Sequence, residues 1–360
     1  MEYGIITASI ILVSAIAIAL QVFFFSPISP EPLILPPSPP LFTPNNHLQV
    51  VSLQGVIKIG EGIVKKPEDV CVDQKGMLYT ATRDGWIKRL HTNGTWENWK
   101  KIHNKDTLLG LIITRVGDLV VCDTEEVGED GEVTALATHL NGEKIRFADD
   151  VVEADDGSLY FSVASTKFEL HNWHLDVLEA KPHGQLLKYD PSTKETSLVL
   201  DGLGFANGVT ISSDQEFLVV CETWKFRCLK YWLKEEMGGK VDVFIDNLPG
   251  GPDNIKLAPD GSFWIAILPL TSSRMKFIHS SRAIKHLLAT FPKLFEQVKV
   301  LDRSAMVINV GSDGRIIKRL DDPNGQVMAF VTSILEFEGN LYFGSLYNDF
   351  IGKLPIETAS

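Results

Sequence analysis

The sequence predicts an all-β protein, a six-bladed β-propeller with an N-terminal membrane-anchor helix and helical insertions. Three observations lead to this prediction. A polar turn followed by an aromatic or β-branched strand occurs six times after residue 50, an uncharged apolar run opens the chain, and two stretches interrupt the strand pattern.

The repeated unit is short, and each copy begins with an Asp- or Gly-containing turn. The six copies read DQKGMLYTAT, RVGDLVVCD, ADDGSLYFSVA, SSDQEFLVVCET, APDGSFWIAI and EFEGNLYFGS. A β-sandwich has more closely spaced turns, whereas a propeller blade has a few strands around one such turn. We therefore expect six blades.

The N-terminal region is divided into an anchor and a stalk. Residues 4–25 form an uncharged apolar run that is long enough to span a bilayer as a helix, and they lack the basic start of a cleaved signal peptide. We expect a signal anchor over residues 1–25, with a signal peptide as the alternative. Residues 26–48 are Pro-rich and predict an extended stalk. The propeller is expected over residues 49–358.

Two insertions interrupt the blades. Residues 165–184 lie within the third blade, and residues 280–298 show helical spacing. The apolar positions of the second insertion are Ile284, Leu287, Leu288, Phe291, Leu294 and Phe295. We interpret both insertions as walls of a substrate site, with purely structural packing as the alternative.

Composition excludes some partners. The formal net charge of the 360 residues is −12, which argues against nucleic acid as a partner. The four cysteines show no CxxC spacing, so a zinc site is not expected. We expect Cys221 and Cys228 to be buried free thiols, with a disulfide between them as the alternative. Asn93 begins a glycosylation sequon, Asn-Gly-Thr, and is a predicted glycosylation site.

Several predicted strands open on a carboxylate or carboxamide, although neither favours a strand. Such residues occur in KPEDV, FADDV, FANGV and GPDNI. One interpretation is that each simply caps a turn. The other is that several openings, brought into register around a propeller axis, form a ring of oxygen ligands.

The longer motifs of the chain resemble the strictosidine synthase-like family. The resemblance covers the predicted propeller, and the segments that carry it are RFADDVV, YFSVASTKF, HLDVLEAKPHGQLLKYDP, LDGLGFANGV, VVCETWKFRCLKYWL, LPGGPDNIKLAPDGSFWIA and LYFGSL. It implies a six-bladed propeller whose wider relatives include calcium-dependent lactonases and esterases, the gluconolactonases and paraoxonases.

The resemblance also implies a metal site. It places Ca²⁺ ligands at Glu68, Asp149, Asn207, Asp253 and Asn254, where Asp149 replaces the Asn usual in relatives. Oxygen donors of this kind suit Ca²⁺. Asp149 or Asp253 is the expected catalytic base that accepts a proton from the attacking water.

Other family residues are replaced. Leu109 and Asp123 stand where paraoxonases carry a His pair, and Thr332 stands where strictosidine synthase carries its catalytic Glu. Glu336 and Glu338 lie nearby in the sequence, but we expect them to point elsewhere. A Thr hydroxyl cannot carry the charge or the proton that the synthase reaction needs.

We therefore predict a metal-dependent hydrolase, an arylesterase-like esterase or lactonase with a small-molecule ester or lactone as substrate. It is expected in the endomembrane lumen, in the endoplasmic reticulum or vacuole, and bound to the membrane through the N-terminal helix. A noncatalytic, membrane-anchored binding propeller is the alternative, and strictosidine synthesis is the third reading. The second blade is expected to be short near Val127, because the sequence passes directly from CDTE to the GEDG turn.

Overall fold

The fold was analysed in a computed structural model of the chain. The structure describes residues 2–35, 49–102, 107–124, 133–234, 237–298 and 303–356, and within these ranges it does not describe the side chains of residues 2–5, 8, 11 and 49.

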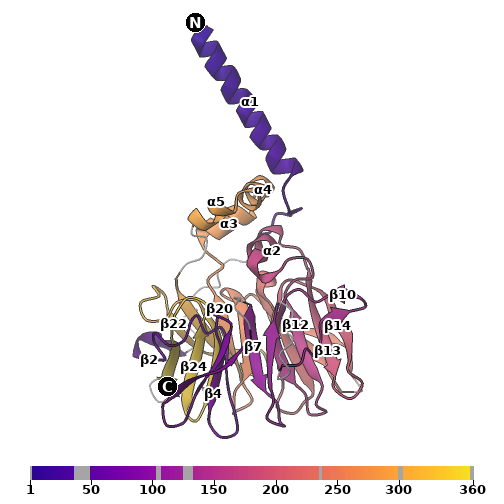
Figure 1. Ribbon diagram of the computed structural model, residues 1–360, viewed down its shortest axis with the longest axis vertical. Helices are drawn as coiled ribbons and strands as arrows, with labels where there is room; N and C mark the ends of the chain where they lie inside the picture. Colours follow the sequence, from indigo (N-terminus) through magenta and orange to yellow (C-terminus); the bar gives the residue numbers. More distant parts are fainter. Residues whose placement is uncertain are drawn as a thin grey trace.

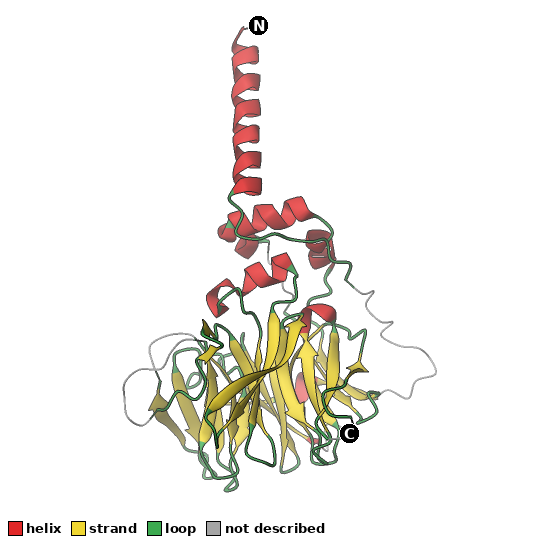
Figure 2. Cartoon of the chain, turned by 90° about the vertical axis from the view of Figure 1, so that its right-hand side faces the viewer, coloured by secondary structure: helices red, strands yellow, loops and turns green. Residues whose placement is uncertain are grey.

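The described residues form a β-propeller (Figures 1 and 2). Two complete blades consist of β3 (Val70–Val72), β4 (Leu78–Ala81), β5 (Trp86–Leu90) and β6 (Trp96–Lys101), and of β11 (Ala148–Glu153), β12 (Leu159–Val163), β13 (Gly184–Asp190) and β14 (Glu195–Leu203). The next two contain β15 (Ala206–Ile211), β16 (Phe217–Glu222), β17 (Arg227–Trp232) and β18 (Val241–Ile245), and β19 (Gly251–Leu257), β20 (Phe263–Leu268), β21 (Ala305–Val310) and β22 (Ile316–Asp322). The last contains β23 (Val331–Phe337), β24 (Asn340–Ser345) and β25 (Ile351–Pro355).

Two N-terminal strands complete these sheets. Strand β2 (Ile57–Ile59) pairs antiparallel with β25 and supplies the fourth strand of the last blade. Strand β1 (Gln49–Ser52) pairs parallel with β22, and the short helix η1 (Leu53–Gly55) follows it. The start of the propeller is thereby joined to its end, which closes the ring.

The described residues form five complete blades, so the prediction of six is wrong. In the described residues, the second position holds only two strands, β7 (Leu108–Ile113) and β8 (Leu119–Asp123), which pair with each other. Strand β7 contacts β3 on one side and β11 on the other. The hairpin of β9 (His139–Leu140) and β10 (Glu143–Lys144) contacts β14 instead of β8, so β8 gains no third strand among the described residues. Val127 lies outside the described residues.

The first strands of the sheets surround the central axis. Each contacts the first strand of the next sheet, in the order β3, β7, β11, β15, β19, β23 and back to β3. This arrangement buries the first strands. Strand β15, for example, lies between β11 and β19 and is buried along its whole length. Residues at the start of these strands therefore lie close to the axis.

Both predicted insertions contain helices. Helices η2 (Leu170–Asn172) and α2 (Trp173–Glu179) connect β12 to β13, while α3 (Ser273–His279), α4 (Arg282–Thr290) and α5 (Pro292–Gln297) connect β20 to β21. Ser272 and Ser281 cap α3 and α4 by accepting hydrogen bonds from Met275 N and Ile284 N.

These helices lie at the edge of the propeller where the first strands begin (Figure 1). In an antiparallel blade, the first strand starts at the edge at which the second strand ends, so a connection from the second to the third strand lies at that same edge. The third such connection is the short helix η3 (Thr223–Lys225), which joins β16 to β17. The helical insertions therefore cover the end of the channel that contains the polar strand openings.

The N-terminal segment forms a helix, α1 (Glu2–Phe24), that projects from the propeller on the side of the helical insertions (Figure 1). Among the residues that the structure describes, no helix meets the length and hydropathy needed to cross a bilayer. The anchor helix predicted from the sequence is therefore not confirmed.

The first part of the predicted stalk does not extend freely. Residues 26–35 pack on the helical insertions, where Leu33 N donates a 2.9 Å hydrogen bond to His279 O and Ser29 N donates a 2.7 Å bond to Glu179 Oε1. Lys285, which is fully buried, donates a 2.6 Å hydrogen bond to Glu31 O. The rest of the stalk, residues 36–48, lies outside the described residues.

Cys221 and Cys228 form a disulfide, so the expectation of free thiols is wrong. They are directly opposite each other on β16 and β17, and both side chains are buried. The pairing register of this hairpin brings the two sulfur atoms together. Cys71 and Cys122 are free and buried.

Candidate functional site

The candidate ligands lie where the first strands depart from regular pairing. The register shifts between Ala148 and Val151 in β11, between Ala206 and Val209 in β15, and between Pro252 and Ile255 in β19. Such a β-bulge breaks the alternation of side chains and re-aims them. The irregular residues are Asp149 and Asp150, Asn207 and Gly208, and Asp253 and Asn254.

Two of the glycines allow the first strands to approach each other closely. A Cβ atom on Gly208 would lie 2.5 Å from Asp253 O, and one on Gly110 would lie 2.7 Å from Asp149 O. Any side chain at these positions would push a neighbouring strand away. The two glycines thus bring together the strands that carry the candidate ligands.

The structure brings the five predicted ligands together from four different sheets. Asn254 Nδ2 donates a 2.8 Å hydrogen bond to Glu68 Oε1, and the side chains of Asn207 and Asp253 are hydrogen-bonded to each other. Glu68 also interacts electrostatically with Asp149 and Asp253. All five side chains are buried.

Three oxygen atoms of this group have no protein partner. They are Glu68 Oε2, Asn207 Oδ1 and Asn254 Oδ1, and each is inaccessible to solvent. A buried, unpaired oxygen costs about 1–3 kcal/mol or more. The unpaired atoms belong to three different strand openings, and carboxylate and carboxamide oxygens are donors that a hard cation takes.

Burial raises the pKa values of the Glu68, Asp149 and Asp253 carboxyls well above their ordinary values. Repulsion from neighbouring carboxylates adds to the rise for each of them. Several negative charges in one dry site are unfavourable. Protonation or a bound cation would relieve this repulsion.

A second layer of charges lies beside the predicted ligands and was missed in the sequence. Lys256 Nζ is 2.8 Å from Asp69 Oδ2 and 3.4 Å from Asp150 Oδ1, and both carboxylates are fully buried. Asp69 Oδ2 also accepts from Leu111 N, and Asp150 Oδ2 accepts from Val209 N. Through these contacts the three side chains link β19, β11, β7, β15 and the residues just before β3. The available signal was the position of Lys256 two residues after Asn254, which places both on one face of a strand.

The residues that replace family residues have structural contacts. Thr332 is fully buried and its hydroxyl donates a 2.6 Å hydrogen bond to Glu68 O. Leu109 packs in the apolar core, and Asp123 Oδ1 accepts a 2.7 Å bond from Thr107. Glu336 accepts a 2.7 Å bond from Trp264 Nε1, and Glu338 lies in the exposed turn that follows β23. Neither glutamate joins the group of candidate ligands.

Asn93 lies in the exposed turn between β5 and β6, where its Oδ1 accepts a hydrogen bond from Thr95 N. Its glycosylation stays a prediction. In the part of the chain that the structure describes, no three His, Cys, Asp or Glu side chains are arranged as a metal site by themselves.

Comparison with known proteins assigns the chain to a family. The strictosidine synthase family matches residues 149–236, and the strictosidine synthase-like N-terminal family matches residues 42–90. Protein STRICTOSIDINE SYNTHASE-LIKE 4 of Arabidopsis thaliana is 33% identical over 91% of this chain and 90% of its own length. The chain belongs to the strictosidine synthase-like family. Adipocyte plasma membrane-associated protein of Rattus norvegicus is 31% identical, over 92% of this chain and 94% of the relative.

Solved structures share the propeller fold with this member of the strictosidine synthase-like family. A gluconolactonase of Xanthomonas campestris matches with a TM-score of 0.56 at 14% identity, covering 81% of this chain and 86% of its own. The calcium-binding protein regucalcin of Agrobacterium tumefaciens matches with a TM-score of 0.54 at 14% identity, covering 85% and 95%. At this identity the likeness shows the fold alone.

Proposed function

We propose that this strictosidine synthase-like protein is a calcium-dependent hydrolase of esters or lactones. The observation that carries the proposal is the meeting of three carboxylates and two carboxamides, three of whose buried oxygens have no partner. Carboxylate and carboxamide oxygens are the donors that Ca²⁺ takes, usually six to eight in number. The fold shared with a gluconolactonase and with calcium-binding regucalcin supports this choice of metal and reaction.

The residues that would hold Ca²⁺ are Glu68, Asp149, Asn207, Asp253 and Asn254. When bound, the ion supplies a positive charge for the substrate carbonyl oxygen. Asn254 Nδ2 donates to one oxygen of Glu68, and the other oxygen, which is buried and unpaired, is available to the ion. Asn207 and Asp253 are likewise hydrogen-bonded to each other, and Asn207 Oδ1 remains without a partner.

Asp149 and Asp253 are the proposed proton acceptors. Both side chains are buried among the other proposed ligands, and a carboxylate in that position is the group that accepts a proton from a water beside the ion. One of them takes the proton of the attacking water and returns it to the leaving oxygen. Thr332 takes no part in this transfer, since its hydroxyl donates to Glu68 O. We do not propose strictosidine synthesis for the same reason.

The test is hydrolysis of phenyl acetate by the full chain, measured with calcium, after removal of calcium by EGTA, and after calcium is restored. We expect activity to be lost and then recovered. A protein that binds calcium but hydrolyses no aryl ester or lactone would instead be a noncatalytic binding propeller. Activity that is unaffected by EGTA would contradict the role of the metal.

We further propose that the propeller resides in the endomembrane lumen, with α1 attached to the membrane. Helix α1 exposes large apolar side chains, including Ile10, Leu12 and Val13, which favour a covered location. The disulfide of β16 and β17 and the exposed sequon at Asn93 support an oxidising lumen. Protease protection of the propeller in intact microsomes tests this proposal, and digestion without detergent would contradict it.

A further inference from the structure

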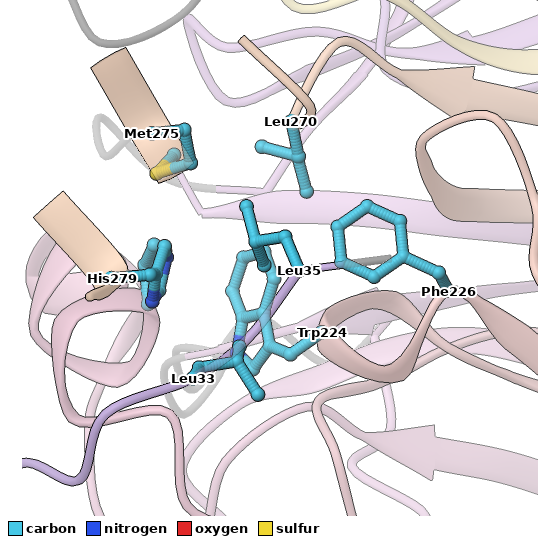
Figure 3. Close-up of a pocket in the computed structure, with 8 residues that line it drawn as sticks. Leu33, Leu35, Trp224, Phe226, Leu270, Met275 and His279 are labelled. Carbon is cyan, nitrogen blue, oxygen red and sulfur yellow. The ribbon is translucent and has the colours of Figure 1, made fainter. Parts of the chain in front are cut away.

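The chain fills an apolar pocket on the helical insertions with its own linker. Leu33 and Leu35 lie in this pocket (Figure 3). The neighbouring Ile34 does not line the pocket and is 94% exposed. The remaining lining residues are Val177, Trp224, Phe226, Leu270, Met275 and His279. They come from α2, from the η3 connection, from α3 and from the segment that precedes α3. With the two leucines in place, a free volume of only about 10 Å³ remains.

The pocket contains a polar atom that the linker does not satisfy. His279 is 3% exposed, and its Nδ1 has no hydrogen-bond partner, although its backbone oxygen accepts from Leu33 N. Burial lowers the pKa of His279 to about 3, so its ring is neutral at physiological pH. An apolar occupant with one hydrogen-bonding atom would therefore match the pocket better than a leucine side chain does.

The floor of the pocket is joined to the strand openings of the candidate site. The Trp224 ring packs on Phe205 at a centroid distance of 4.6 Å, and Phe205 directly precedes β15. Thr223, next to Trp224, donates from Oγ1 to Pro252 O at 2.8 Å, immediately before Asp253. The pocket thus lies within a few residues of Asn207 and Asp253, at the same edge of the propeller.

The linker is held by apolar packing of Ile28, Leu33 and Leu35 and by a few hydrogen bonds. These are the hydrogen bonds from Ser29 N to Glu179 Oε1, from Leu33 N to His279 O and from Lys285 Nζ to Glu31 O. Such a segment competes with any ligand for the pocket from within the same molecule, at a high effective concentration. It also continues directly from α1, so its position depends on where α1 is held.

We propose that this pocket binds the apolar group of the substrate, an aromatic or aliphatic group with one hydrogen-bonding atom near His279. We further propose that residues 26–35 are an autoinhibitory strap that must leave the pocket first. The assignment to substrate rests on the proposed function, whereas the strap and the pocket are tested by binding alone.

The experiment measures binding of 2-naphthol to the full chain by fluorescence titration in EGTA, so that neither metal nor catalysis is required. Replacing Leu33 and Leu35 together by Ser weakens the strap, and Ile34→Ser is the matched control on the same segment. The double variant should bind 2-naphthol about tenfold more tightly than the wild type, because a larger fraction of molecules is competent to bind. The Ile34→Ser variant should bind as the wild type does.

A third variant tests the site itself. Adding His279→Leu to the double variant should weaken 2-naphthol binding about tenfold and leave naphthalene binding unchanged, because only the hydroxyl loses a partner. If the serine pair fails to fold, Leu33→Ala with Leu35→Ala replaces it. Unchanged affinity in a folded double variant, or equal gains with Ile34→Ser, would overturn the strap. Tighter 2-naphthol binding by the double variant, combined with no phenyl acetate hydrolysis in the presence of calcium, would leave the strap intact and contradict only the proposed reaction.

Discussion

Replacing Lys256 by Met is expected to destabilise the propeller far more than the loss of an ordinary surface lysine. The side chain of Lys256 is 14% exposed, and it is the cation between Asp69 and Asp150, which are fully buried on other sheets. Methionine preserves most of the volume of lysine and removes the charge. Both aspartates keep their backbone donors, Leu111 N and Val209 N, but lose the positive charge between them.

Removing one partner from a buried ion pair costs about 3–5 kcal/mol, which sets the expected loss in the free energy of unfolding. Burial raises the pKa of Asp150 to about 6 even though Lys256 opposes the rise. Without Lys256 this pKa rises further, so the native variant takes up a proton more readily than the unfolded chain. The loss of stability should therefore be largest at about pH 8 and smaller at about pH 5.

Urea unfolding followed by circular dichroism measures both effects. Lys188→Met is the control, because Lys188 pairs with the exposed Asp156 at 3.7 Å and should contribute less than about 1 kcal/mol. A loss below about 1 kcal/mol for Lys256→Met, or a loss that does not depend on pH, would refute the role given to this lysine.

Three further predictions concern the same propeller. Burial raises the pKa values of the Glu68, Asp149 and Asp253 carboxyls, so the metal-free protein should lose stability as pH rises from their unfolded pKa values through their folded ones. Thermal melts at a series of pH values test this prediction, and added calcium should make the melting temperature depend less on pH. Replacing Cys221 and Cys228 by Ala should lower the free energy of unfolding by about 2.5 kcal/mol, because the disulfide closes a chain loop between cysteines that are 7 positions apart. Urea unfolding that is the same for the double variant and the wild type would contradict this prediction. Thr332→Glu should leave aryl ester hydrolysis largely intact and should not create condensation of tryptamine with secologanin; product analysis by mass spectrometry decides the second point.

The blade pattern could be predicted because each blade repeats one local signal, a polar turn before a strand that is rich in aromatic and β-branched residues. The count was wrong at β7 and β8. Whether β8 gains a third strand depends on long-range pairing, and the next hairpin among the described residues, β9 and β10, contacts β14 instead. Local sequence does not encode that choice.

The strand openings could be singled out because residues such as Asp253 and Asn254 recur there, and the resemblance to the family implied that they are metal ligands. The structure brings these side chains together, and their binding of a metal stays a prediction. Why two successive residues turn inward was not predictable, since the β-bulges that re-aim them depend on the partner strand. Lys256 was missed for a similar reason, because its partners Asp69 and Asp150 are far away in the sequence. The docking of Leu33 in an apolar pocket was also hidden, since proline-rich composition indicates an extended chain and says nothing about what the chain packs against.

Calcium titration calorimetry on the full chain tests the central claim most directly. We expect one Ca²⁺ per molecule for the wild type, no detectable binding for Asp253→Ala, and unchanged binding for Asp260→Ala, whose carboxylate lies in the turn between β19 and β20 and accepts from Ser262. Saturating calcium should also raise the melting temperature of the wild type, because an ion that binds only the native state adds about 2.7 kcal/mol at one hundred times its dissociation constant. No heat of binding and no change in melting temperature for the wild type would contradict a metal site in the channel, and equal binding by Asp253→Ala would place the ion elsewhere.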